Sequence, residues 1–420
     1  MNFIPNTASE KEEMLKSIGA RSIEELFKGF EPKLKRELNL SQPMSELELS
    51  VHMCALSKKN KPMRYFVGGG AYDHYVPSAV GQIVSRSEFY TAYTPYQAEV
   101  SQGTLQAIYE FQTFMCILTG MDVANASMYD GASALAESAF IACDATGRNE
   151  IAVLNALNPN YERVLKTYCD AHGIKIRSEV TEKTACVVVQ NPDFEGNVHQ
   201  LEEFAEKAHA AGALLVACVV EPTSLALLKP PGECGADVVA GEAQALGNPV
   251  SFGGPFLGYI AVKKEQMKRI PGRLCGITTD AKGNRGFVLT LQAREQHIRR
   301  ERASSNICSN QALCALAATV YLSLMGKTGL RNVAKLSYER AHELQRRLCG
   351  IGFTLENKKP FYNEFVVKCP AKPRKIIGAL ARKGIHAGID LGGERMLVCC
   401  TEKNSEQDVE EYAGVVKAVL

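Results

Sequence analysis

One segment of the sequence collects donor groups of the kind that bind anions. It spans residues 299–310, reads RRERASSNICSN and lies just before a predicted helix. Guanidinium, hydroxyl and amide donors in an irregular stretch can bind a phosphate or cap the helix that follows. We expect Ser309 and Asn310 to cap that helix. For Ser305 and Asn306 both uses stay open.

A second segment, residues 90–103, combines aromatic rings and polar groups around a proline turn. Its candidate residues are Tyr90, Tyr93, Tyr96, Gln97 and Glu99. Such groups suit a surface that shapes a pocket and excludes water. A buried loop whose tyrosine hydroxyls satisfy backbone groups would have the same composition, so this alternative stays open. Arg294 is a further candidate for anion binding, with an ordinary surface ion pair as its alternative.

The composition is that of a soluble globular protein. Of the 420 residues, 46% are hydrophobic and 22% are charged, and the formal net charge is +2. This small charge gives no strong field toward nucleic acid or an anionic membrane. The N-terminus has no secretory signal pattern, and no uninterrupted apolar stretch approaches the roughly 18 residues of a membrane helix. We expect no nucleic-acid or membrane partner.

The 14 cysteines are scattered through apolar contexts and form no CxxC pair. The eight histidines form no ligand-like cluster with them. This usage is typical of buried, reduced thiols in a cytoplasmic protein. We therefore expect a cytoplasmic location and no metal site.

The elements that must position the candidate residues alternate between strands and helices from about Asn149 onward. Short apolar runs such as EIAVLNAL, ACVVVQN, ALLVACVV, ADVVAG and LGYIAVK read as strands. Two of the gaps hold helical stretches that end in glycine, residues 160–173 and 200–212. This pattern predicts an α/β doubly wound domain, whose parallel sheet is covered on both faces. Any site is then expected at the carboxyl ends of the strands.

We expect three parts: a helical N-terminal arm (1–60), a large domain (61–309), and connector helices with a small C-terminal α/β domain (310–420). Two connector helices are predicted after Asn310, and the second ends at Gly350. Capping pairs are predicted at the first and last helices, Ser9 with Glu12 and Ser405 with Asp408.

A large doubly wound domain followed by a small α/β domain is the architecture of fold-type-I pyridoxal-phosphate enzymes, which alone is a weak argument. Two segments are more specific, residues 90–137 and 286–316. They resemble characteristic regions of the P-protein (glycine decarboxylase) family of the glycine cleavage system, and residues 4–19 resemble the start of that family. The resemblance covers essentially all 420 residues. It is closest to the N-terminal half, which can be a separate α subunit called subunit 1.

The resemblance implies where a cofactor lysine would lie. The catalytic half of the family carries a His-Lys pair about eight residues after the aspartate of a buried strand, because an amine must bind the cofactor. The same count from Asp237 reaches Gln244 and Ala245, and neither has a primary amine. The next lysines, Lys263 and Lys264, close a strand and are expected to be solvated.

Two further elements of a cofactor site are altered. The acid that pairs with the pyridinium nitrogen is usually Asp, and the corresponding residue here is Glu221. The phosphate cradle corresponds to a helix start with Asp130, Gly131 and Ser133, where free N–H groups and the helix dipole would attract an anion. Asp130 can cap this helix with its own carboxylate and would repel a phosphate. We therefore expect a vestigial pocket.

The resemblance implies that this chain serves glycine decarboxylation as a partner of a β subunit (subunit 2) in an α2β2 assembly. That subunit would carry the lysine and pyridoxal 5'-phosphate, and the aminomethyl group would pass to the lipoyl arm of the H-protein. This chain has no expected catalytic residue and is expected to be inactive alone. The residues expected to face the partner's site are Tyr93, Tyr96, Gln97, Glu99, Arg294, Ser305 and Asn306.

Two rival hypotheses stay open. One is a self-sufficient pyridoxal-phosphate enzyme that uses a non-standard lysine, for which Lys263, Lys264 and Lys229 would be the candidates. The other is a non-catalytic assembly scaffold whose interface segments serve only association. Self-assembly of this chain is a related possibility, because a free half should expose apolar interface surface.

Overall fold

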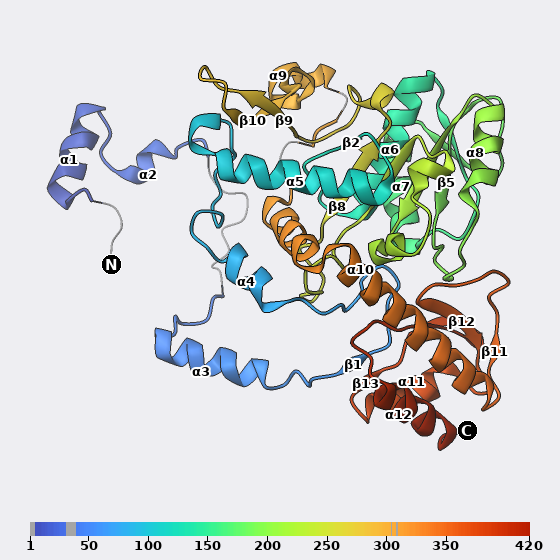
Figure 1. Ribbon diagram of the computed structural model, residues 1–420. Coiled ribbons are helices and arrows are strands. Elements are labelled where there is room, and N and C mark those ends of the chain that lie inside the picture. The colour runs from blue at the N-terminus through green and yellow to red at the C-terminus, as the bar shows by residue number, and fades with distance from the viewer. Residues whose placement is uncertain (1–4, 31–38, 304, 308–309) are drawn as a thin grey trace. The chain divides into compact units, whose positions relative to one another are not determined.

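The computed structural model describes residues 5–30, 39–303, 305–307 and 310–420 (Figure 1). The chain divides into two compact units, Met1–Lys61 and Pro62–Leu420. Each unit is described by itself below.

The described part of the first unit consists of helices without a core. They are α1 (Ala8–Ser17), α2 (Ile23–Leu26) and α3 (Glu46–Ser57), and none of them has a buried residue. The cap of α1 is Thr7, whose backbone N–H donates to the Glu10 carboxylate at 2.6 Å. The predicted cap at Ser9 is wrong, because the Thr-x-x-Glu box two residues earlier already supplies both reciprocal bonds.

The second unit contains a seven-stranded sheet with the order β2-β8-β7-β6-β5-β3-β4. Its strands are β2 (Val123–Ala124), β3 (Glu150–Val153), β4 (Lys175–Arg177), β5 (Thr184–Gln190), β6 (Leu214–Val219), β7 (Val238–Glu242) and β8 (Gly258–Val262). Strands β3, β5, β6 and β7 are parallel neighbours, as predicted. Strand β4, which the sequence reasoning missed, pairs in parallel with β3. Strand β8 is antiparallel to β7, and β2 is antiparallel to β8, so the sheet is mixed.

The sheet is mostly parallel, as predicted, and β8 is the exception among the strands recognised from the sequence. Residues 243–257 connect β7 to β8 and contain no helix. A parallel neighbour needs a crossover that carries the chain back to the other end of the sheet, usually through a helix. Without that helix the chain re-enters the sheet at the end where β7 leaves it.

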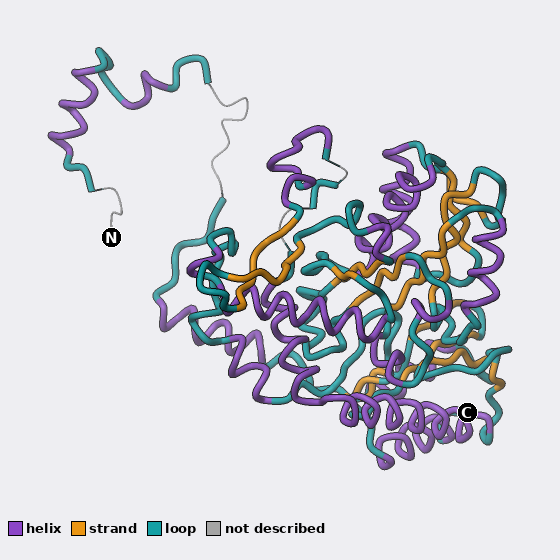
Figure 2. Tube along the Cα trace, turned by 45° about the horizontal axis from the view of Figure 1, so that its top comes forward, coloured by secondary structure: helices purple, strands orange, loops and turns teal. Residues whose placement is uncertain are grey.

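Helices cover both faces of the sheet (Figure 2). They are α5 (Gln102–Thr119), α6 (Gly131–Thr146), α7 (Pro159–His172) and α8 (Leu201–Ala210). Val188 and Val216 pack in one core with α6 and α7, whereas their neighbours Val187 and Leu215 pack in the other core with α5 and α8. Successive strand residues point to opposite faces, so an all-apolar strand must be covered twice. The predicted two-sided burial is confirmed.

A hairpin and a short helix follow the sheet. Strands β9 (Leu274–Thr279) and β10 (Arg285–Thr290) pair antiparallel, and Phe287 and Leu289 pack on Leu105 and Ile108 of α5. After β10 the chain forms the four-residue helix α9 (Gln296–Arg299). This hairpin leads the chain back to the tyrosine segment before α5, where the His297 ring meets Tyr96.

Helix α10 (Ala312–Cys349) connects this region to the C-terminal part. It bends at Gly326, whose φ of 55° and ψ of −171° are not helical, and this bend separates the two connector helices that the sequence predicts. By length and composition α10 could cross a membrane, yet 50% of its most apolar stretch is buried inside the structure. Its first half packs in the core that α5 and α8 share.

The C-terminal part is a small α/β arrangement, as predicted. A four-stranded sheet has the order β11-β12-β15-β14, and a further pair joins β1 to β13. The elements are β1 (Arg64–Tyr65), β11 (Thr354–Leu355), β12 (Glu364–Lys368), α11 (Pro373–Ala381), β13 (Ile385–His386), β14 (Ile389–Gly392), β15 (Arg395–Cys399) and α12 (Glu406–Lys417). The predicted cap of α12 is confirmed, since Ser405 and Asp408 form both reciprocal bonds. The division of the chain at residues 60 and 309 stays a prediction.

Candidate functional site

The first turn of α6 lies at the end of β7, where the sequence predicts the phosphate cradle. Asp130 caps the helix as predicted, because its Oδ1 accepts a hydrogen bond from the Ser133 N–H at 2.7 Å. The N–H of Gly131 donates to Oε2 of Glu242 at 2.9 Å. Two carboxylates of the chain itself therefore occupy the positions that a phosphate would take at a helix N-terminus.

Glu242 is a site residue that the sequence reasoning missed. It ends β7 and is 1% exposed, and it also accepts hydrogen bonds from the N–H groups of Leu257 and Gln244 at 2.7 and 3.0 Å. Burial raises the pKa of Glu242 to about 7, although the backbone donors lower it. The available signal was an acidic residue at the end of an otherwise apolar strand.

The expected lysine position is filled by core packing. Ala245 is 1% exposed and belongs to the hydrophobic core under α6. Gln244, at the expected histidine position, forms hydrogen bonds with three backbone groups. Its amide donates to the carbonyls of Tyr72 and Asn248 at 3.1 and 2.6 Å, and its oxygen accepts from the Tyr72 N–H at 3.0 Å. Both positions serve the structure of the loop after β7.

The alternative lysines lie away from this pocket. Lys263 forms an ion pair of 2.9 Å with Asp237, which immediately precedes β7. Because β8 runs antiparallel to β7, Lys263 and the exposed Lys264 follow the end of β8 at the opposite edge of the sheet from Glu242. Lys229 pairs with Glu202 at 2.9 Å on the surface. None of the three reaches the predicted cofactor position.

Glu221, at the expected acid position after β6, is fully engaged. Its Oε1 accepts hydrogen bonds from the N–H and hydroxyl of Thr223, and its Oε2 lies 3.1 Å from Nε2 of His74. The other ring nitrogen of His74 lies 2.6 Å from Glu402, which belongs to the C-terminal part. This buried Glu–His–Glu chain joins the strand-end edge of the sheet to the segment after β15.

The charge of His74 follows from this environment. Burial lowers the pKa of His74, but the negative charges of Glu221 and Glu402 and their hydrogen bonds outweigh burial and raise it to about 10. His74 is therefore an imidazolium at neutral pH. The imidazolium pairs with the Glu221 carboxylate, which is the group that a pyridinium nitrogen would need as its partner.

A cavity of about 310 Å³ remains at the vestigial pocket. Asp130, Glu242, Asn158 and Tyr161 are among its lining residues. Pyridoxal phosphate in this fold needs an amine, a free acid and an anion cradle. Here the amine position is alanine, the acid is bonded to His74, and the cradle holds carboxylates. The residues of this pocket do not fit the cofactor.

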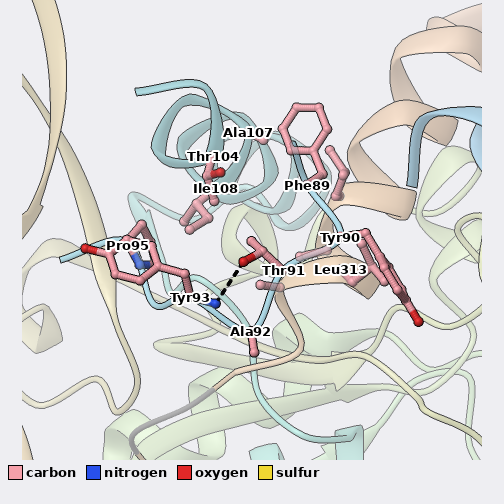
Figure 3. Close-up of a pocket in the computed structure, with 13 residues that line it drawn as sticks. Phe89, Tyr90, Thr91, Ala92, Tyr93, Pro95, Thr104, Ala107, Ile108 and Leu313 are labelled. Carbon is pink, nitrogen blue, oxygen red and sulfur yellow. Dashed lines mark hydrogen bonds between the residues drawn. The ribbon is translucent and has the colours of Figure 1, made fainter. Parts of the chain in front are cut away.

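The tyrosine segment lines a second cavity, of about 400 Å³, between α5 and the start of α10 (Figure 3). Tyr90, Tyr93 and Tyr96 are 71%, 47% and 46% exposed, so these rings are not buried in a loop. Tyr93 donates from its hydroxyl to the side-chain oxygen of Gln97 at 3.2 Å. Glu99 is also exposed. The predicted cluster thus forms an open aromatic surface.

Tyr96 and Arg294 each contact the turn before β9, residues 270–273. Both terminal nitrogens of Arg294 donate to backbone carbonyls, those of Ile270 and Gly272. The next residue, Arg273, is 4% exposed, and its guanidinium lies over the Tyr96 ring at 5.5 Å. Arg294 therefore fixes the turn that holds the Arg273 guanidinium against the face of the Tyr96 ring. Sequence reasoning missed Arg273, which no motif marks.

Ser305 of the donor-rich segment makes its contacts within the chain. The hydroxyl of Ser305 accepts from the Ile307 N–H at 3.1 Å and also bonds Glu137. Burial raises the pKa of Glu137 to about 7, and the bond from Ser305 lowers it. Asn306 is exposed, whereas Ser309 lies outside the described residues.

The predicted capping by Asn310 is wrong. Its amide donates to the Ala126 carbonyl at 3.3 Å, and its oxygen accepts from Arg273 at 3.3 Å. Helix α10 starts only after Gln311, which forms no side-chain cap. Asn310 instead links the helix start to the buried Arg273.

In the part of the chain that the structure describes, no group of three or more His, Cys, Asp and Glu side chains could hold a metal ion. The described cysteines are free thiols, and most of them are buried.

Residues 1–416 match the model of the family described as glycine cleavage system P-protein. Two relatives named probable glycine dehydrogenase (decarboxylating) subunit 1, from Desulforamulus reducens and Moorella thermoacetica, are 49% and 48% identical over 100% of this chain and 100% of theirs.

The solved structures that resemble this chain include a member of the same family. A crystal structure of glycine decarboxylase (P-protein) of the glycine cleavage system, in inhibitor-bound form, has a TM-score of 0.92 and 44% identity over 100% of both chains. An alanine–glyoxylate aminotransferase from Nostoc sp. has a TM-score of 0.61 at 14% identity, over 92% of this chain and 100% of the other, and shares the fold alone. The predicted fold class, α/β and fold-type-I-like, is confirmed.

Proposed function

This chain belongs to the glycine cleavage system P-protein family, and from this we propose that it is the α subunit (subunit 1) of a split glycine decarboxylase whose cofactor lysine lies on a partner β subunit. The complex decarboxylates glycine and transfers the aminomethyl group to the lipoyl arm of the H-protein. Pyridoxal 5'-phosphate, bound by the partner, supplies the electron sink for decarboxylation. This chain holds no cofactor covalently and is inactive alone.

One observation carries the proposal. The lysine position is the buried Ala245, and the helix start that would cradle a phosphate already binds Glu242 and Asp130. A phosphate there would meet two carboxylates in a poorly solvated pocket, which is strongly unfavourable. This supports the proposal that the partner subunit binds the cofactor of the complex.

The contribution of this chain is a surface that completes the partner's site. Tyr93, Tyr96, Gln97 and Glu99 are exposed together, and Arg294 holds the turn beneath Tyr96. Exposed aromatic rings beside a cavity of about 400 Å³ suit a surface that excludes water from a neighbouring site. Asn306 is exposed and free to reach a partner, whereas Ser305 already bonds Glu137.

We propose an α2β2 assembly, which the name subunit 1 of the relatives supports by implying a second subunit. A cytoplasmic location is proposed as well. The described cysteines are free, and reduced thiols are usual in that compartment.

The test is an absorption spectrum of the purified chain with pyridoxal phosphate, alone and with the partner subunit. We expect no lysine-bound cofactor absorbing near about 420 nm in this chain alone. Glycine–bicarbonate exchange should appear only in the mixture. A borohydride-reduced adduct on this chain by itself would establish the rival, a self-sufficient enzyme.

A matched variant makes the same test by a second route. Lys229, Lys263 and Lys264 are replaced together by arginine, which keeps their charge and the ion pairs of Lys229 and Lys263. We expect the complex with this variant to keep full exchange activity. Loss of the cofactor signal in that complex would identify one of these lysines as the cofactor residue.

A further inference from the structure

Glu295 is a buried acid at the start of α9. Its side chain is 2% exposed, and within the described residues neither carboxylate oxygen has a hydrogen-bond partner. Burial of a charged group without compensation is costly, so such a group is retained where a partner charge or donor meets it. The question is which group faces this carboxylate.

His297 lies within ion-pair distance of the buried acid. Its Nδ1 is 3.6 Å from Oε2 of Glu295, slightly beyond a hydrogen bond. The imidazole is 37% exposed and can be reached from outside the chain. A carboxylate behind one ring nitrogen and access to the ring from outside is the arrangement of a histidine that exchanges protons. Such contacts are often long before the substrate binds and shorten afterwards.

The pair lies at the surface proposed to face the partner. The ring of His297 meets Tyr96 edge-on, with centroids 5.8 Å apart and planes at 61°. Arg273 lies over the same tyrosine. Arg294, the residue before Glu295, feels the charge of this carboxylate, and its terminal nitrogens are held by backbone carbonyls. Arg294 is thus fixed as a structural charge, whereas the His297 imidazole is open to the outside of the chain.

We propose that Glu295 and His297 form an acid–imidazole pair that accepts the ammonium proton of glycine at the site shared with the partner subunit. This inference rests on the proposed function. The N–H bond of the ammonium breaks, the proton bonds to the imidazole, and the electron pair stays on the glycine nitrogen as the nucleophile. The proton then leaves to water from the exposed ring, and Glu295 stabilises the imidazolium while it exists.

The first experiment replaces His297 by alanine in the reconstituted complex. We expect kcat/KM for glycine to fall by about 100-fold, the lower range for loss of a general base. Added imidazole should raise kcat/KM of this variant by at least about tenfold, which would not occur if the side chain had a purely structural role. The deficit should shrink as the pH rises, because more glycine then enters with a free amine. His172→Ala is the matched control, since His172 is an exposed histidine on α7.

A second variant tests the buried acid. Glu295→Gln keeps the shape of the side chain and removes its charge, and we expect a smaller loss of kcat/KM. The double variant with His297→Ala should be no slower than His297→Ala alone, because the carboxylate acts through the imidazole. Additive losses would overturn the pairing of the two residues.

A readout independent of activity uses wild-type protein only. Histidine modification by diethyl pyrocarbonate, quantified by mass spectrometry, should label His297 in the free chain and much less in the complex, while His172 reacts equally in both. Unchanged labelling of His297, or an active complex that tolerates His297→Ala, would overturn this inference alone. An inactive wild-type mixture would instead overturn the proposed function.

Discussion

The backbone N–H of Gly131 donates a hydrogen bond of 2.9 Å to the carboxylate of Glu242, across 111 residues of sequence. This bond joins the start of α6 to the end of β7, where the sequence analysis expects the phosphate cradle. The protein thus supplies its own anion to the helix dipole. The shape of a cofactor cradle is kept, while its charge preference is reversed.

Glu242→Gln should lower the free energy of unfolding by about 2 kcal/mol, because an amide cannot accept all three backbone N–H groups and turns a donor toward them. Urea unfolding of the full chain measures the loss. The control is Asp130→Asn, which keeps an efficient helix cap and should change stability by less than about 0.5 kcal/mol. Equal losses in both variants would contradict the special role of Glu242.

Gly131→Ala should destabilise the protein by about 1–3 kcal/mol. A Cβ at this position would overlap the hydroxyl of Tyr161 and press on the backbone of Glu242. Gly103→Ala in α5 is the matched control, since a Cβ there meets nothing within 4 Å. That variant should gain about 0.5–1 kcal/mol from helix propensity, so thermal unfolding should shift in opposite directions for the two glycines.

His74→Gln should remove a stabilisation that depends on pH. The pKa of His74 is raised from 6.5 to about 10 by Glu221 and Glu402 against its burial, so its contribution is complete below pH 6.5 and is lost as the pH rises through about 10. At about pH 6 the wild type should be more stable by about 3 kcal/mol, because a buried charge pair is broken in the variant.

Urea unfolding at a series of pH values tests this trend. Burial also raises the pKa of Glu242 and Glu364 to about 7. The contribution of these two acids to the free energy of unfolding therefore falls as the pH rises from 4.5 toward 7. Both proteins share that loss, so it cancels in the difference between wild type and variant. A difference that stays constant from pH 6.5 to 10 would mean that His74 is not charged in the folded protein.

Part of the site could be predicted because it depends on local sequence. Asp130 caps α6 through a bond to Ser133 three residues away, and such caps are visible in the chain itself. The absence of an amine at Gln244 and Ala245 also needs only counting along the sequence. The strand runs of β3, β5, β6 and β7 were recognisable because strands covered on both faces are continuously apolar.

The remainder depends on contacts between distant residues. Glu242 reaches Gly131, and His74 joins Glu221 to Glu402, only after the sheet has brought these segments together. The direction of β8 could not be predicted, because its apolar run is the same for either orientation. Asn310 was predicted to cap α10, but the buried Arg273 competes for its oxygen. In each case a tertiary partner decided the outcome.

Tyr96→Ala should lower the exchange activity of the complex by at least about tenfold while the two subunits still associate. Tyr96 is 46% exposed and rests on the buried Arg273, so its ring has a fixed position from which it can close the partner's site. The control is Tyr338→Ala on α10, where the tyrosine is 42% exposed and lies against His342. Size-exclusion chromatography with light scattering follows assembly, and the exchange assay follows activity. An assembled complex of full activity would favour the scaffold hypothesis, because the aromatic surface would then serve association alone.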